Sequence, residues 1–437
     1  MQNSRGITRR QTIKAGLAGA ASLSLADILR LRAQSAEAGQ TPRDTAVIYI
    51  LQEGGASQFE TYDPKPSAPV EFRGEFDAIR TSVPGVLFSE AMPRQAALMH
   101  RLTVLRSLHH PSTQHSSSVH LLKTGFYCRA ESNDNEMPSV GSYVARIRGA
   151  NERGMPPYAL LYHAERYDGG HFLGRGYNPF LVRTSNDNRT MQIPSSISLL
   201  DGMTNEQWQD RQRLLTQFDD TRRALDTQGV ADSIDHFRRQ AFEMVSSPLA
   251  RRAFNLDAEP TAVRERYGLT PIGQRMLLAR RLVEHGVTFV TVGTFGWDHH
   301  SDLWSDLRRN GPMFDQGVAA LVEDLQQRGL SERVLVVIMG EFGREPRVTS
   351  LPNLTPGREH WGNSMSALLA GGGLRGGQVV GATDSRGGFP IESPYRTECV
   401  LAHAYRHLGI DPAQTFPDFS GRPRNLLDVR GVIRELA

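Results

Sequence analysis

Three acidic residues each follow a short apolar segment of the chain. Glu53, Asp298 and Glu341 come soon after runs rich in β-branched residues, and glycines that permit tight turns stand beside them. Ligands of open α/β sheets bind at the carboxyl ends of parallel strands, because the loops converge there. If the three apolar runs are neighbouring parallel strands, the three carboxylates therefore come together at one edge of the sheet.

Histidines add imidazole donors to these carboxylates. His299 or His300 lies next to Asp298, and His360 stands in the polar, turn-rich segment 357–362. Carboxylates and neutral imidazoles together suit zinc, manganese or another borderline divalent ion. Each residue alone also has an ordinary structural interpretation, such as an ion pair between Glu341 and a nearby arginine. Three strands that all end in an acid are harder to attribute to chance, so the sequence favours a metal site.

Ser57 is the candidate nucleophile. It lies just after the first apolar run, where exposed backbone amides can hold an anion and a metal can lower the pKa of a hydroxyl. A serine at this place can equally be a helix N-cap. The Gly-x-Ser-x-Gly pattern of an α/β-hydrolase nucleophile is lacking, so that type of serine hydrolase is not supported.

A second polar cluster occupies residues 106–125 and contains four histidines. Its candidate substrate-binding residues are Arg106, His115, His120 and Lys123. The cations suit phosphate or sulfate oxygens, with arginine the better bidentate donor, and the imidazoles can bind metal or stabilise a departing oxyanion. A surface loop without a ligand explains the same residues almost as well.

The elements that would position these residues alternate along the chain. Continuous apolar runs typical of strands covered on both faces are residues 46–51, 287–292 and 334–339. Helical spacing predicts helices over residues 273–285 and 318–327, ended by Gly286 and Gly329. Alternation of strand and helix predicts an α/β fold with a mostly parallel sheet and helices on both faces. The polar, helix-prone segment 199–252 is expected to form a peripheral helical insertion.

Composition narrows the class of protein. The 437 residues are 39% hydrophobic, enough for a large core. Fifty Lys+Arg against 47 Asp+Glu leave a net charge of +3, too near balance for an electrostatic nucleic-acid footprint, so nucleic acid is not an expected partner. Two cysteines exclude a disulfide-dense scaffold and a cysteine-ligated zinc ribbon.

The N-terminal segment has the features of an export signal. Arg9 and Arg10 precede an uncharged run over residues 15–26, which is typical of a twin-arginine export signal. We expect residues 1–38 to be this signal, with cleavage after Ala38 or a few residues earlier, and residues 39–437 to form one domain. An ordinary helix that starts with an arginine pair is the alternative. No later stretch is long and apolar enough for a membrane span. The expected partner is the twin-arginine export machinery, and the expected location is the periplasm or another exported compartment.

Motifs along nearly the whole mature chain resemble an exported family called domain of unknown function 1501. They are Glu53-Gly54-Gly55-Ala56-Ser57, Asp63-Pro64-Lys65-Pro66, Arg106-Ser107-Leu108-His109-His110, Ala279-Arg280-Arg281-Leu282-Val283-Glu284, Trp297-Asp298-His299-His300, Gly340-Glu341-Phe342-Gly343-Arg344 and Gly357-Arg358-Glu359-His360-Trp361. That family is in turn similar to the alkaline phosphatase and sulfatase superfamily. The resemblance implies an alkaline phosphatase-like sheet with one or two divalent ions, zinc foremost, at the strand ends.

The resemblance also implies roles for individual residues. It places Asp298, His300 and His360 at one metal and Glu53 and Glu341 at the other, with Ser57 as the nucleophile. Phosphatases of the superfamily usually have aspartate where Glu53 and Glu341 stand and histidine where Phe342 stands. The motif that sulfatases mature to formylglycine is missing.

The function expected from these features is an exported metal-dependent hydrolase of phosphate or sulfate esters, acting on a small-molecule or glycan ester. A non-catalytic exported binding or assembly protein that keeps the fold is the alternative. A metal-independent serine esterase is a third interpretation.

Overall fold

The computed structural model describes residues 44–129, 134–162, 166–183, 240, 243–244, 247–350 and 355–436. The predicted signal segment, residues 1–38, lies outside the described residues, and so does most of the predicted insertion over residues 199–252.

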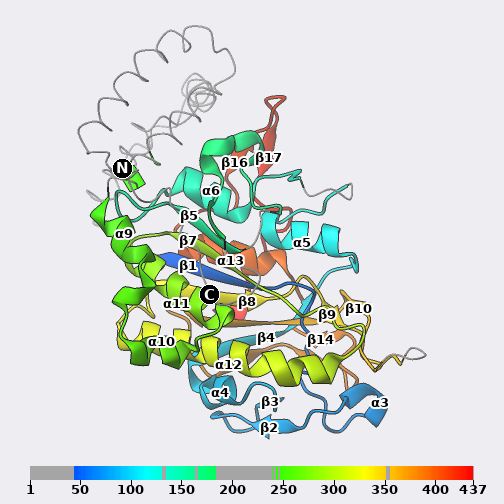
Figure 1. Ribbon diagram of the computed structural model, residues 1–437. Coiled ribbons are helices and arrows are strands. Elements are labelled where there is room, and N and C mark those ends of the chain that lie inside the picture. The colour runs from blue at the N-terminus through cyan, green and yellow to red at the C-terminus, as the bar shows by residue number, and fades with distance from the viewer. Residues whose placement is uncertain are drawn as a thin grey trace, which may run out of the picture. The chain divides into compact units, whose positions relative to one another are not determined.

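A nine-stranded sheet forms the centre of the described part of the chain (Figure 1). Its strand order is β12-β4-β11-β8-β1-β7-β5-β6, and β15 also pairs with β4. The strands are β1 (Ala46–Gln52), β4 (Leu102–His109), β5 (Tyr158–Tyr162), β6 (Phe180–Arg183), β7 (Phe289–Thr294), β8 (Val334–Met339), β11 (Met365–Gly371), β12 (Gln378–Val380) and β15 (Tyr395–Arg396). β11 runs antiparallel to both its neighbours, and every other pairing in the sheet is parallel.

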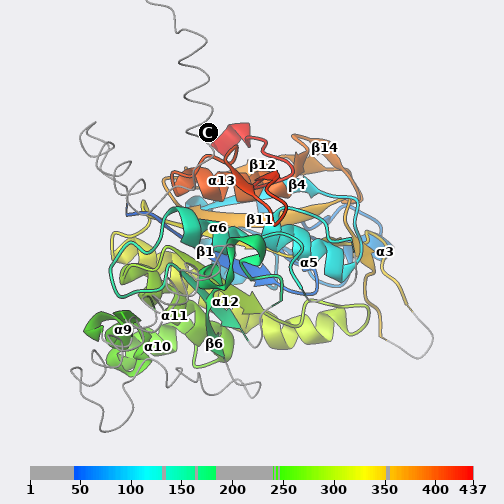
Figure 2. The same cartoon turned by 90° about the horizontal axis from the view of Figure 1, so that it is seen from above.

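Helices cover both faces of the sheet (Figures 1 and 2). One face packs against α4 (Pro93–Ala97), α9 (Pro248–Phe254), α10 (Thr261–Tyr267), α11 (Pro271–Glu284) and α12 (Leu303–Gln327), and the other against α5 (His115–Thr124), α6 (Val140–Ile147) and α13 (Glu398–His407). Alternate residues of β1 serve the two cores: Ile48 and Ile50 enter one, and Val47, Tyr49 and Leu51 enter the other. This burial of every residue explains the continuous apolar run. The predicted fold class, a mostly parallel sheet with helices on both faces, is confirmed.

The predicted elements agree with the observed ones in type. The strand expected over residues 287–292 is β7, which lies two residues later, and one helix differs in length. The helix expected over residues 318–327 is only the second half of α12, which begins at Leu303 and contains Pro312. A proline inside a helix removes one hydrogen bond and normally favours an end there. Burial of Leu303, Trp304 and Leu307 in the core holds the segment before Pro312 helical.

The order of the strands brings the predicted site residues together. β1 lies between β7 and β8 and runs parallel to both, with Gln52 opposite Thr294 and Leu51 opposite Met339. The three strands therefore end at the same edge of the sheet, and the loops that carry the three acids leave from adjacent positions.

Short elements complete the described chain. They are α3 (Val70–Arg73), β2 (Ala78–Arg80), β3 (Leu87–Ser89), β9 (Gly343–Arg344), β10 (His360–Trp361), β13 (Ala382–Thr383), β14 (Pro390–Glu392), β16 (Thr415–Pro417), β17 (Pro423–Asn425), and 3-10 turns at Met99–Arg101, His171–Leu173, Arg175–Tyr177, Leu256–Ala258 and Arg434–Leu436. The β9–β10 pair sets His360 opposite Arg344. No helix in the described ranges is both long and apolar enough to cross a membrane.

Candidate metal centre at the strand ends

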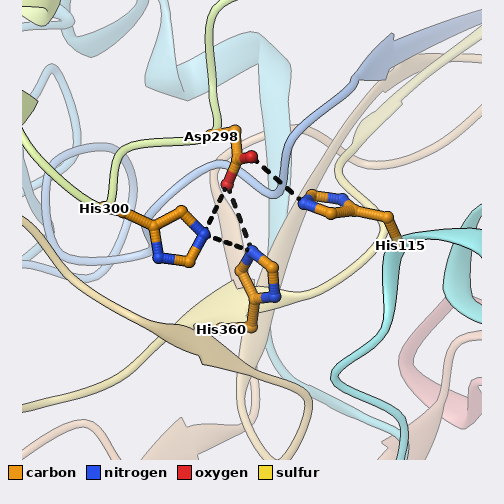
Figure 3. A group of neighbouring side chains, drawn as sticks. All are labelled: His115, Asp298, His300 and His360. Atoms are coloured by element: carbon orange, nitrogen blue, oxygen red, sulfur yellow. Dashed lines mark hydrogen bonds and ion pairs between the residues drawn. The ribbon is translucent and has the colours of Figure 1, made fainter.

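Four side chains from three parts of the chain converge at this edge of the sheet. They are His115 on the first turn of α5, Asp298 and His300 in the loop after β7, and His360 on β10. One potential ligand atom from each lies within 4.8 Å of all the others. Figure 3 shows the three imidazole rings arranged around the Asp298 carboxylate.

The spacing of three of these groups fits a single divalent cation. Nε2 of His300 and Nε2 of His360 are 2.9 Å apart, and each is 3.1 Å from Oδ1 of Asp298. A tetrahedral zinc ion with bonds of about 2.0–2.1 Å keeps its donor atoms about 3.3 Å apart. The observed triangle is only slightly tighter than that, and its donors are of the types that zinc prefers. These residues therefore fit a divalent metal.

Hydrogen bonds on the outer side of two rings orient them toward this point. Nδ1 of His300 lies 2.7 Å from Oε2 of Glu359, and Nδ1 of His360 lies 2.9 Å from the carbonyl oxygen of Thr113. Each outer acceptor calls for a proton on Nδ1, which leaves the Nε2 lone pair directed inward. This is the arrangement expected of histidines that ligate through Nε2.

His115 is held differently, because both its nitrogens face carboxylates. Nε2 lies 3.2 Å from Oδ2 of Asp298 and Nδ1 lies 2.7 Å from Oε1 of Glu341. These hydrogen bonds, to Asp298 first and to Glu341, outweigh partial burial and raise the pKa of His115 to about 9. Sequence reasoning assigned His115 to substrate binding, and the structure places it among the candidate metal ligands.

Asp298 is the centre of the group. Partial burial alone raises the pKa of this carboxyl, but its contacts with the His115, His360 and Arg344 side chains hold that pKa well below the ordinary aspartate value. Asp298 is therefore ionised and is available as an anionic ligand throughout the physiological pH range.

The fully buried Arg344 fixes both Asp298 and the loops around it. Nη2 of Arg344 lies 2.7 Å from Oδ1 of Asp298 and 3.1 Å from the carbonyl oxygen of Trp297. The guanidinium also donates to the carbonyl oxygens of Gly54, Gly55 and Arg358. Sequence reasoning considered Arg344 only as a partner for Glu341. Its position three residues after the strand-end acid Glu341 was the available signal for a role at the site.

Gly54 allows the loop after β1 to approach the site. Its φ angle is +112°, and a Cβ atom there would lie 2.4 Å from the backbone nitrogen of Asp298. The amide nitrogen of Gly54 donates to both carboxylate oxygens of Glu341, at 2.9 and 3.1 Å. The buried Glu341 is thus bound to the β1 loop and to His115, and it stands beside the four-residue group.

Glu53 and Lys123 lie in contact with each other, although sequence reasoning gave them separate roles as metal ligand and substrate contact. Nζ of Lys123 is 3.4 Å from Oε1 of Glu53 and 2.9 Å from Oδ2 of Asp168, and Oε2 of Glu53 accepts from the Tyr162 hydroxyl. Burial lowers the pKa of Lys123, but Asp168 and Glu53 more than offset this, so its pKa is raised. Asp168, which sequence reasoning did not select, follows a short strand in a Gly-containing turn, as the other acids do.

Ser57 is buried, with 2% of its surface exposed. Its hydroxyl donates to Oε2 of Glu60, whose Oε1 lies 3.0 Å from Nη2 of the buried Arg358. Its carbonyl oxygen accepts a hydrogen bond of 2.7 Å from the Thr61 hydroxyl. Ser57 is therefore part of a buried chain of hydrogen bonds and ion pairs within the loop after β1.

Arg106 and His120, the remaining predicted substrate contacts, are engaged by backbone groups. The Arg106 guanidinium donates to the carbonyl oxygens of Tyr62 and Leu87, each at 2.8 Å. The His120 ring lies 2.6 Å from the carbonyl oxygen of Phe126 and accepts from the amide of Glu136 at 3.1 Å. The structure does not bring these two side chains into the four-residue group.

Phe342 forms an apolar side of the centre. Its ring centroid is 4.3 Å from that of His360 and 5.0 Å from that of His115. The buried ring restricts both imidazoles and supplies no ligand atom, at the position where the resemblance places a histidine in phosphatases.

Solved structures similar to this chain include a sulfatase, an alkaline phosphatase superfamily protein and an alkaline phosphatase. A sulfatase from Pseudoalteromonas sp., PsFucS1, is 11% identical over 88% of this chain and 71% of its own, with a TM-score of 0.37. An alkaline phosphatase superfamily protein from Vibrio parahaemolyticus is 12% identical over 81% and 70%, with a TM-score of 0.36. A mutant of TAB5 alkaline phosphatase with magnesium bound is 10% identical over 85% and 99%, with a TM-score of 0.37.

No curated protein matches the chain. A family model described as "Protein of unknown function (DUF1501)" matches residues 44–437, which is nearly all of the chain and the whole of its described part. The resemblance inferred from the motifs is confirmed, and the chain belongs to the DUF1501 family.

Proposed function

We propose that this protein is a metal-dependent hydrolase of phosphate or sulfate esters. The observation that carries the proposal is the triangle formed by Asp298, His300 and His360, whose donor atoms lie about 3 Å apart at the carboxyl ends of parallel strands. A divalent cation held there, zinc in the first instance, would polarise the P–O or S–O bonds of a bound ester.

The chain's own residues prepare the site around that position. Glu359 and the Thr113 carbonyl hold the outer protons of His300 and His360, so that both Nε2 atoms face inward. Arg344 fixes the direction of the Asp298 carboxylate. His115 holds a proton between Asp298 and Glu341, and it is the group best placed to pass one to an oxygen at this edge.

Ser57 is retained in the proposal as the nucleophile. Its hydroxyl is already hydrogen bonded to Glu60, a carboxylate that can accept its proton. Because the side chain is buried, attack on a substrate requires the loop after β1 to open. Ser57→Ala is expected to abolish turnover, and Ser305→Ala, an exposed hydroxyl on α12, should leave turnover unchanged. Equal turnover in the two variants would remove Ser57 from the mechanism.

The ester-hydrolase proposal is tested by turnover on a panel of phosphomonoesters, phosphodiesters and sulfate esters, small and glycan-linked. The assay uses protein supplied with zinc or manganese, the same protein after chelation, and the variant His360→Gln. We expect turnover by the metal-loaded wild type and none after chelation or in His360→Gln. The control variant His100→Gln, at an exposed histidine, should retain turnover. Turnover that persists in His360→Gln would contradict the proposal.

The second candidate is a non-catalytic binding or assembly protein that retains the fold. Phe342 favours it, because an apolar ring lies against the rings of His360 and His115 where a further ligand could stand. Metal bound at one ion per chain with no turnover on the whole panel would select this candidate. We further propose that the chain is exported through the twin-arginine machinery and acts in the periplasm or another exported compartment.

A further inference from the structure

The contacts of Lys123 point to a feature that goes beyond the proposed ester hydrolysis, although it rests on the same metal site. We propose that the centre binds one divalent cation and that the ammonium group of Lys123 permanently occupies the place of a second. The motif resemblance implied a second metal at Glu53 and Glu341, and the described side chains do not fit that arrangement.

The first support is the set of contacts around Glu53. One carboxylate oxygen of Glu53 faces Nζ of Lys123 at 3.4 Å, and the other accepts from the Tyr162 hydroxyl. An ion bound to Oε1 of Glu53 at about 2.1 Å would lie within about 5.5 Å of the ammonium nitrogen. Two cations that close in a poorly solvated place repel strongly. Glu53 is therefore the partner of a lysine that is already there.

The second support is how firmly Lys123 is held. Only 3% of its side chain is exposed, and Nζ has three partners: Glu53, Oδ2 of Asp168 at 2.9 Å and the carbonyl oxygen of Arg166 at 2.9 Å. Asp168 is fixed in turn by the Tyr158 hydroxyl at 3.1 Å and by the Arg166 amide at 3.0 Å. Lys123 cannot swing out to solvent without leaving two carboxylates unpaired.

The experiment is elemental analysis of the full-length protein equilibrated with excess zinc and then freed of loosely bound ions. We expect one zinc per chain in the wild type and in Glu53→Gln, because Glu53 does not ligate. Two ions in the wild type, or loss of an ion in Glu53→Gln, would overturn the inference while leaving the proposed metal site intact. No ion in the folded wild type would overturn the proposed function and this inference together.

The variant Lys123→Met tests the role of the ammonium directly. Removing the charge leaves Glu53 and Asp168 facing an apolar chain, and we expect a second, weaker ion to bind, raising the count toward two. Lys123→Arg keeps the charge and should stay at one, and adding Glu53→Gln to Lys123→Met should restore one. One zinc per chain in a folded Lys123→Met would overturn the inference. If Lys123→Met does not fold, the zinc content of Glu53→Gln tests the inference instead.

Discussion

Oδ1 of Asp298 lies 2.7 Å from Nη2 of Arg344, a guanidinium with no exposed surface. The same oxygen faces Nε2 of His300 and of His360, each at 3.1 Å. Oδ1 of Asp298 thus contacts both Arg344, which supports the site, and the two candidate ligands His300 and His360. The backbone carbonyls that Arg344 also binds belong to the loops after β1 and β7 and to the segment before β10.

Replacing Arg344 should damage both folding and metal affinity. Arg344→Met leaves Asp298 and several buried carbonyl oxygens without donors, and we expect a loss of about 3 kcal/mol in the free energy of unfolding. Metal affinity should fall about 10–100-fold, as for the loss of other groups that orient a ligand. Urea unfolding and zinc titration measure the two effects. Arg347→Met, at an exposed arginine nearby, should change neither, and equal effects in the two variants would refute this account.

Substitution of Gly54 should disturb the site through the backbone alone. In Gly54→Ala the new methyl group would meet the backbone of Asp298 at 2.4 Å in a region of positive φ. Gly85 has a φ of +83° and nothing within 4 Å of an added Cβ, so Gly85→Ala reports the conformational cost alone, about 1 kcal/mol. We expect Gly54→Ala to lose clearly more stability and to bind zinc more weakly. Equal unfolding curves and equal zinc affinities in Gly54→Ala and Gly85→Ala would show that the close approach of Gly54 to Asp298 is unimportant.

Stability should depend on pH in the acid range through the half-buried His403. Burial, followed by the nearby charges of His407 and Arg406, lowers the pKa of His403 to about 4, against about 6.5 in an unfolded chain. Between pH 6.5 and pH 4 the His403 ring is protonated in the unfolded chain but not in the folded chain. The contribution of His403 to the free energy of unfolding is therefore complete above pH 6.5 and is lost as the pH falls toward 4.

His403→Gln isolates that contribution. Denaturant unfolding between pH 7 and pH 4 should show a fall in stability that is shallower in His403→Gln than in the wild type, by about 3 kcal/mol at pH 4. His100→Gln, at an exposed ring, should follow the wild-type curve. If the slopes of wild type and His403→Gln coincide, His403 does not titrate as described.

The export proposal has its own test. Replacing Arg9 and Arg10 together by lysine should block export of the folded protein, because the twin-arginine pair is what the machinery reads. Fractionation of cells that express the full chain should then find it inside rather than in the exported fraction. Arg5→Lys, outside the pair, should be exported normally. Export of the double variant at the wild-type level would contradict a twin-arginine route.

The strands and their acids could be predicted because each carries its own local signal. Every residue of β1, β7 and β8 is buried, so the apolar runs were continuous, and the acids stood directly behind them. The antiparallel direction of β11 had no such signal, since a buried strand has the same composition in either direction. The full length of α12 could not be predicted either, because Pro312 normally favours the end of a helix and tertiary packing overrides that preference here.

Contacts between distant residues could not be predicted from the sequence. Pairing of Lys123 with Glu53, 70 positions apart, depends on α5 packing over the end of β1, which no spacing encodes. His115 was recognised as chemically capable, but the identity of its partners comes only from the geometry of the first turn of α5. Arg106 looked free for an anion because its carbonyl partners, Tyr62 and Leu87, lie in segments whose approach to β4 the sequence does not give.

The most direct test of the metal centre is the zinc content of purified wild-type protein beside Asp298→Asn and Asp302→Asn. Asp302 is an exposed acid in the same loop and serves as the matched control. The centre described above predicts close to one zinc per chain in the wild type and in Asp302→Asn, and less than about a tenth of that in a folded Asp298→Asn. Equal zinc in all three proteins, or none in the wild type after reconstitution, would contradict it.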